Sequence, residues 1–254
     1  MFCAFGYENF KYRNRFEIIK SMNNPTSKSV SYLGFYSAIL TPIVTLVTFI
    51  IAFLTEPLSG PWCQSSCFSY PFLDTASRYP SDYIWMYPAM LLLVIYLVLM
   101  VSIHHGASPE KKIYSHLATL FAFGSVLIFV VDYFLQLSVI QPSLLRGEVD
   151  GISLLTQFNP HGIFIAMEEI AFILMSLSFL FMAPVFVGDR LQKSIRWVFV
   201  SSFIVTVLSF LLLIFRFGIN REYFFEVTAF SINWLTLVIS GILLSFLFRK
   251  SMKQ

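Results

Sequence analysis

The sequence predicts an all-α integral membrane protein: a bundle of six transmembrane helices with both termini in the cytoplasm. Composition, six long apolar runs and the placement of basic residues carry this prediction. Of 254 residues, 57% are hydrophobic and only 12% are charged, and the mean hydropathy is +0.75. Soluble domains carry about twice that charged fraction, so lipid rather than water has to surround much of this chain.

Six apolar runs are each long enough to cross ~30 Å of hydrocarbon at ~1.5 Å per residue. A helix satisfies its backbone hydrogen bonds within one segment, and these runs are too long for barrel strands, so each run is predicted to be a helix. The runs cover residues 32–54, 83–103, 113–140, 159–187, 195–217 and 223–248.

The segments around the runs complete the predicted organisation. Residues 1–31 form a basic N-terminal segment, interpreted either as an interfacial helix on the inner leaflet or as a solvated arm that fixes topology. Residues 32–250 then form a six-helix transmembrane domain. Asn159–Pro160 offers an N-cap followed by proline, which predicts the start of the fourth helix.

Basic residues set the predicted orientation in the cell membrane. With the N-terminus inside, 13 of the 17 Lys and Arg residues fall in inner segments. The outer segments hold only Arg78, Arg146, Arg216 and Arg221. The positive-inside rule therefore favours two cytoplasmic termini. Basic residues in alternate loops also differ from the concentrated basic surface of nucleic-acid-binding proteins, a class that this distribution excludes.

Cysteine placement agrees with this orientation. Cys63 and Cys67 fall in the predicted outer loop, residues 55–82, where a disulfide persists, whereas Cys3 falls inside. Three residues separate the paired cysteines, so the two-residue spacing of a redox motif is absent. The sequence therefore predicts a structural disulfide between Cys63 and Cys67.

Carboxylates inside the apolar runs are the strongest indication of a site. Asp132, Glu168 and Glu169 lie within predicted helices, and Asn233 falls at a similar depth, ~12–15 Å from the outer helix ends. A lone carboxylate in hydrocarbon costs about 2.5–3.5 kcal/mol on insertion scales, so each one needs a partner, a proton or water.

The expected counter-ion is Arg216, at the outer end of the fifth run, with Arg221 as the second candidate. His161 lies seven residues before Glu168 and so nearly on the same helix face. We therefore expect the embedded acids and Asn233 to bind a ligand or protons in an outer-half pocket, with Arg216 and His161 near its mouth. The alternative is a packing network, because intramembrane hydrogen bonds often only hold helices together, at ~0.6 kcal/mol each.

A metal site is a weaker candidate. His104, His105 and His116 lie at the inner ends of the second and third runs, but no two of them are four residues apart on one helix. The sequence contains no nucleotide motif and no phosphate-binding glycine loop, and it predicts no cofactor.

The leading functional interpretation is non-enzymatic: binding or translocation of a small molecule or ion through the outer-half pocket. One alternative is a membrane-embedded enzyme that uses paired carboxylates on a lipid or small substrate. Another is a scaffold subunit whose polar groups meet a partner helix. The expected partners are the lipid bilayer, the ligand and, in an oligomer, a second copy of the chain.

Overall fold

A computed structural model describes residues 25–55, 57–221 and 223–252. Across these ranges the chain forms helices and contains no strand, which confirms the all-α prediction for this part of the chain. The predicted N-terminal segment lies outside the described residues, except for its last residues, which belong to the first helix.

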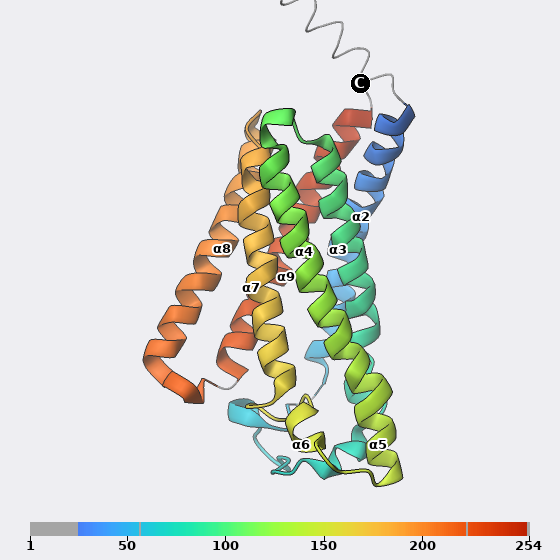
Figure 1. The fold of residues 1–254 in the computed structure, drawn as a ribbon, viewed down its shortest axis with the longest axis vertical. Helices are drawn as coiled ribbons and strands as arrows, with labels where there is room; N and C mark the ends of the chain where they lie inside the picture. Colours follow the sequence, from blue (N-terminus) through green and yellow to red (C-terminus); the bar gives the residue numbers. More distant parts are fainter. Residues whose placement is uncertain (1–24, 56, 222, 253–254) are drawn as a thin grey trace, which may run out of the picture.

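Six helices are long and apolar enough to cross a membrane, and they follow the six predicted runs in order. This is the pattern of a multi-pass membrane protein. The six are α2 (Pro25–Phe53), α3 (Met86–Gly106), α4 (Lys112–Leu135), α7 (Ile163–Met182), α8 (Arg190–Phe217) and α9 (Tyr223–Met252). Two short helices, α5 (Gln141–Arg146) and α6 (Ile152–Leu155), lie near one end of the bundle (Figure 1).

The six long helices pack side by side as a closed ring. Contacts run from α2 to α3, α4, α7, α8 and α9, and α9 returns to α2. Helix α7 also packs against α9 across the bundle, so side chains of these two helices can meet in its interior. Helix α8 lies at the periphery in Figure 1, and its exposed face is apolar along most of its length.

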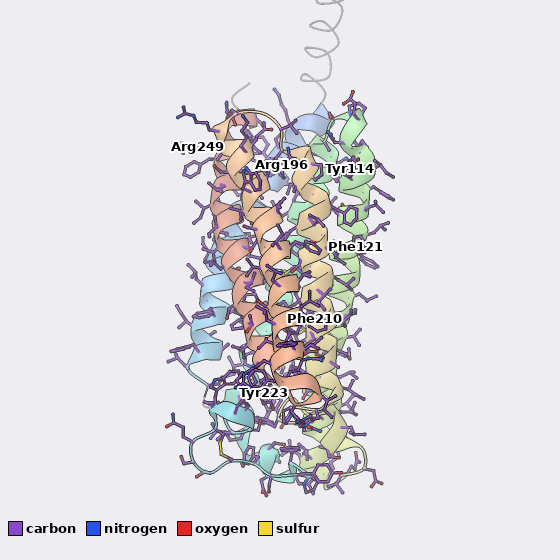
Figure 2. The ribbon with its side chains drawn as sticks, turned by 90° about the vertical axis from the view of Figure 1, so that its left-hand side faces the viewer. Tyr114, Phe121, Arg196, Phe210, Tyr223 and Arg249 are labelled. Carbon is purple, nitrogen blue, oxygen red and sulfur yellow. A yellow bond between two sulfur atoms is a disulfide. The ribbon has the colours of Figure 1, made fainter. Side chains whose placement is uncertain are left out.

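The two ends of the bundle differ in their loops and charges. We call the end that carries residues 54–82 the disulfide end and the other the basic end; Tyr223 marks the first and Arg249 the second in Figure 2. The start of α2 and the end of α9 lie together at the basic end, as six crossings require (Figure 1). Its described basic residues are Lys28, Lys111, Lys112, Arg190, Lys193, Arg196, Arg249 and Lys250.

Several predicted helix boundaries differ from those of the structure by a few residues, and two of these differences have a clear physical cause. The fourth helix begins at Ile163 rather than at Asn159, because the Asn159 side chain accepts a hydrogen bond from the His161 N–H (2.9 Å) and closes a turn instead of capping a helix. The third helix does not end at residue 140. It continues through a π-helical turn, Gln136–Ile140, and α5 until Gly147, whose positive φ of 75° ends it.

Small residues let neighbouring helices approach closely. A Cβ atom on Gly241 of α9 would lie 2.6 Å from Cδ of Pro42 and 3.0 Å from the Ala38 carbonyl oxygen, both on α2. The backbones of α2 and α9 can therefore meet here only without a side chain. Between α4 and α7, Ser125 Oγ donates to the Ala171 carbonyl at 2.8 Å. Such small-residue contacts and hydrogen bonds hold helices together in a membrane.

Candidate functional site

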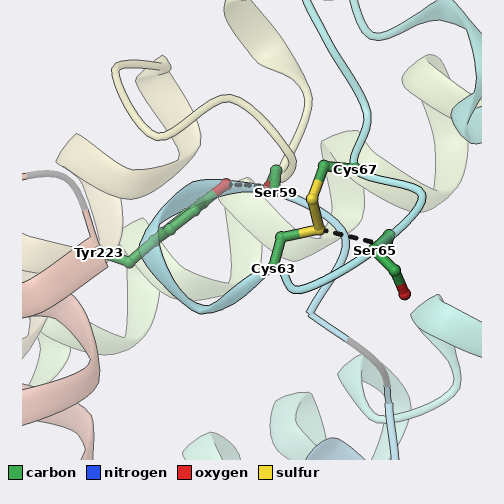
Figure 3. Close-up of a disulfide and its surroundings, with 5 residues drawn as sticks. All are labelled: Ser59, Cys63, Ser65, Cys67 and Tyr223. Carbon is green, nitrogen blue, oxygen red and sulfur yellow. Dashed lines mark hydrogen bonds between the residues drawn. A yellow bond between two sulfur atoms is a disulfide. The ribbon is translucent and has the colours of Figure 1, made fainter.

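The loop at the disulfide end is tied to the start of α9. Cys63 and Cys67 form the predicted disulfide, with an S–S distance of 2.04 Å. Figure 3 shows the Ser59 hydroxyl beside the Tyr223 hydroxyl, 2.7 Å away. Tyr223 donates to the Gln157 carbonyl at 3.2 Å, so its hydroxyl accepts from Ser59. One tyrosine thus joins the disulfide loop, the segment before α7 and helix α9.

Beneath this loop the helices leave a hollow of about 210 Å³, which adjoins a second hollow of about 190 Å³ closer to the loop. Trp85, Tyr223 and Glu226 are among the residues that line both. We call the two hollows together the acidic pocket. Half of the side chains around the inner hollow are aromatic: Trp85, Tyr133, Phe164, Phe172, Tyr223, Phe230 and Trp234.

Two carboxyl groups from different helices meet in the inner hollow. Glu168 on α7 is 3% exposed, and its Oε1 accepts a hydrogen bond from the Tyr133 hydroxyl at 2.7 Å. Glu226 on α9 lines the same hollow, and its carboxyl group interacts electrostatically with that of Glu168. Two neighbouring carboxylates repel each other, which favours a state in which one of them carries a proton. The pair is therefore expected to hold a single negative charge.

No cationic side chain among the described lining residues neutralises the Glu168–Glu226 pair. Among the described residues, neither hollow is lined by a Lys, Arg or His side chain. Asp82 lines the outer hollow, but Arg78 binds its two carboxylate oxygens at 2.8 Å and 3.2 Å. A two-point Arg–carboxylate contact of this kind is strong and directional. The facing pair of Glu168 and Glu226 is therefore the charge that a ligand in the inner hollow meets.

Asp132, a predicted member of the site, does not line the acidic pocket. It lies on α4 beside Tyr133 and is 2% exposed. Its Oδ2 atom has no hydrogen-bond partner among the described residues. Of these two predicted acids, only Glu168 lines the hollow.

Glu169 faces a different hollow from its neighbour Glu168, as the ~100° step between adjacent helical residues requires. It forms a two-point ion pair with Arg221, in which Arg221 Nε donates to Glu169 Oε1 at 3.0 Å. These hydrogen bonds raise the pKa of Arg221. The pair lines a separate hollow of about 270 Å³ together with His161. His161 is thus near Glu169 rather than near the acidic pocket.

The expected counter-ion Arg216 is not beside the acids. Its side chain is exposed, and its guanidinium group lies 5.5 Å from the centre of the Phe217 ring. Helix α8 diverges from the other helices toward the disulfide end, where Arg216 lies (Figure 1). The chain then turns at Gly218 (φ 58°), and Arg221 after this turn contacts Glu169 on α7. The second candidate, Arg221, is therefore the ion-pair partner of Glu169.

Asn233 takes part in helix packing and does not line either hollow. It is fully buried on α9, and its Oδ1 accepts from Ser176 of α7 at 3.1 Å. The Ser176 hydroxyl also lies 3.1 Å from that of Thr206 on α8. The Asn233 amide donates to the Ala229 carbonyl at 2.8 Å. This arrangement matches the packing interpretation of the intramembrane polar residues.

The three histidines considered as metal ligands gather at the basic end. The ring centres of His105 and His116 lie 5.9 Å and 5.8 Å from that of His104, and His104 Nδ1 shares a 2.7 Å hydrogen bond with Ser115. Across the described ranges, no group of three or more His, Cys, Asp and Glu side chains could hold a metal ion.

Tyr133 and Glu226 are among the pocket residues that sequence reasoning missed. Glu226 lies in the first turn of α9, where an acidic residue usually complements the helix dipole. On α4 the sequence indicates Asp132 because of its charge, whereas the next residue, Tyr133, lines the hollow. One signal was available: Glu226 lies seven residues before Asn233, and that spacing places it on the interior face of the helix.

Comparisons of this chain with protein-family models, with curated proteins and with solved structures find no match. Function is therefore inferred from the residues of the pocket. A hollow with aromatic walls and a few convergent polar groups is the usual form of a small-molecule site. The acidic pocket has both features, and its carboxyl pair can exchange protons or bind a positive group.

Proposed function

We propose that this protein is a cell-membrane protein that binds a small molecule in the acidic pocket at its disulfide end. The carboxyl groups of Glu168, which is buried, and Glu226, which is half-buried, line one hollow from two helices and carry the proposal. Ionisable groups at membrane depth are costly and generally mark ligand or ion sites. Here two ionisable groups, from two different helices, line the same hollow.

Orientation forms part of the proposal. Eight of the twelve described Lys and Arg residues lie at the basic end, and the positive-inside rule would place that end in the cytoplasm. The Cys63–Cys67 disulfide would then face the oxidising exterior, where such bonds persist. The acidic pocket would be reached from outside the cell.

Binding has more support than passage through the bundle. Next to the acidic pocket lies a separate hollow of only about 10 Å³, whose lining shares Tyr133, Phe172 and Trp234 with the inner hollow. This volume barely accommodates one water molecule. Translocation would require these aromatic side chains to move, whereas binding requires only the space that is present.

An enzyme is the second candidate, because two acids near a common point can act as general acid and base. Glu168 and Glu226 line one hollow from two helices, as this requires. Conversion of a bound compound by the parent protein, lost in both Glu168→Gln and Glu226→Gln variants, would favour the enzyme.

Thiol labelling tests whether the pocket is open to water. Cysteine would replace Val227, which lines both hollows, or Ala229, which is fully buried two residues later on the same helix. A Cys3→Ser background leaves only the disulfide-bonded Cys63 and Cys67. In permeabilised membranes we expect a water-soluble methanethiosulfonate to label the Val227→Cys variant at least ~10-fold faster than the Ala229→Cys variant, since the reagent attacks exposed thiolates. Equal, slow labelling of both would refute the proposal.

A further inference from the structure

We propose that the ligand of the acidic pocket is a small organic cation, an amine or quaternary ammonium group attached to an apolar group. This inference rests on the proposed binding function and specifies its ligand class. It follows from three properties of the pocket: the identity of its walls, the sign of its charge and the small number of oxygen ligands that it offers.

Aromatic rings form the walls, and their contacts hold them in place. Trp234 packs edge-on against Phe230, with ring centres 4.4 Å apart, and Trp85 packs edge-on against Tyr133 at 5.1 Å. Ring faces attract cations through the quadrupole of the π system, most strongly for Trp, and aromatic cages are a recurrent way to bind quaternary ammonium groups. Two tryptophans on different helices, α9 and the start of α3, border the same hollow.

The charge of the pocket selects the sign of the ligand. Glu168 and Glu226 line the inner hollow together, where mutual repulsion favours a single negative charge on the pair, and Arg78 neutralises Asp82 in the outer hollow. Among the described residues that line the two hollows, no side chain carries a positive charge. A carboxylate or phosphate ligand would meet only repulsion here, whereas one positive charge would complete a neutral site.

The same residues argue against a bare metal ion as the ligand. Calcium takes six to eight oxygen ligands, and magnesium demands a regular octahedron of oxygens. The inner hollow offers the two acidic side chains, the Thr55 hydroxyl and the Gln157 amide, and its remaining lining is almost wholly apolar or aromatic. An organic cation needs no complete oxygen shell, and its apolar group could occupy the outer hollow beside Leu58 and Trp62.

Benzyltrimethylammonium is a suitable probe, with phenylacetate as its anionic counterpart and benzyl alcohol as its neutral one. Three of the four tryptophans, Trp62, Trp85 and Trp234, line the pocket, so their fluorescence reports on its occupancy. The purified full-length chain in lipid nanodiscs would be titrated with each probe. We expect saturable binding of the cation, with the anion and the neutral compound at least ~10-fold weaker, the ratio that loss of one charged contact gives.

Matched variants locate the binding. Glu226→Gln and Glu168→Gln keep the side-chain shape and remove an acid from the pocket, whereas Glu148→Gln makes the same change on an exposed side chain at the same end. We expect at least one pocket variant to weaken cation binding by about tenfold or more and Glu148→Gln to leave it unchanged. If both pocket variants unfold, protection of the Val227→Cys variant from labelling by the cation, and not by phenylacetate, is the equivalent readout.

The outcomes separate this inference from the function on which it rests. Equal affinity for the cation, the anion and the neutral probe, or no cation binding at all, would overturn the cation proposal. Rapid labelling of the Val227→Cys variant in the same preparation would then leave the open pocket intact. Slow labelling would overturn the binding function as well.

Discussion

The two halves of the bundle are packed differently. At the disulfide end, the carboxyl groups of Glu168 and Glu226 border a hollow that the surrounding aromatic rings do not close. Towards the basic end the interior is filled: Tyr96 bonds Ser178, and Phe179 stacks on Phe199 with ring centres 5.0 Å apart. Close packing in one half thus holds in place the helices that border the hollow in the other half.

The largest effect is expected from a substitution in the packed half of the bundle. A Gly241→Ala substitution would push a methyl group against Pro42 and the Ala38 carbonyl, and overpacking of this kind costs roughly 1–3 kcal/mol. We expect a clear fall in Tm, measured by thermal unfolding in detergent. Gly124→Ala is the matched control, because its new Cβ would lie 3.7 Å from Leu174, an ordinary contact. Equal Tm changes would contradict the account of α2–α9 packing.

The next largest effect is expected at the Glu169–Arg221 pair. Glu169 is 6% exposed, so an Arg221→Ala variant would leave a nearly buried carboxylate without its partner, at a cost of about 1–3 kcal/mol after allowance for the partial exposure of Arg221. Arg216→Ala removes an exposed arginine at the same end and should leave Tm unchanged. A destabilised Arg216→Ala variant beside a stable Arg221→Ala variant would restore Arg216 as the counter-ion.

A substitution in the pocket should change ligand binding more than stability. Glu168→Gln removes an acid from the hollow and keeps a group that can accept the Tyr133 hydrogen bond, so we expect weaker cation binding with a stability change within about 1 kcal/mol. Binding and thermal unfolding measured on the same sample separate the two effects. A Glu168→Gln variant with a clearly lower Tm and full affinity for the cation would show that this carboxyl group serves packing alone.

The smallest effect is expected at the basic end, at the exposed Asp189–Lys250 pair. Lys250 Nζ donates to the Asp189 carboxylate at 2.8 Å, which, with the Gln192 N–H, lowers the pKa of Asp189. Since the folded-state pKa is the lower one, the pair stabilises the fold above the unfolded-state pKa, and this contribution is lost as the pH falls through the folded value. Asp189→Asn should lower Tm slightly at pH 7 and by less at pH 3. An equal decrease at both pH values would rule out the ionic contribution.

The sequence predicts the scaffold better than the site. Six apolar runs identify six helices because hydrocarbon leaves a long apolar segment few alternatives. On the first run, Ser37, Thr41, Thr45 and Thr48 share one helix face and are buried. Which faces meet across the bundle depends on helix rotation and on turns such as Gly218, which no single run encodes. Glu168 was therefore identified, but its partner Glu226 was not.

Labelling in intact cells tests the central claim most directly, because it joins the open pocket, its orientation and its ligand. The Val227→Cys variant would be exposed to a membrane-impermeant methanethiosulfonate with and without benzyltrimethylammonium. We predict labelling from outside the intact cell, slowed by the cation, with the Ala229→Cys variant unlabelled under both conditions. Labelling that occurs only after permeabilisation, or that the cation leaves unchanged, would contradict the account.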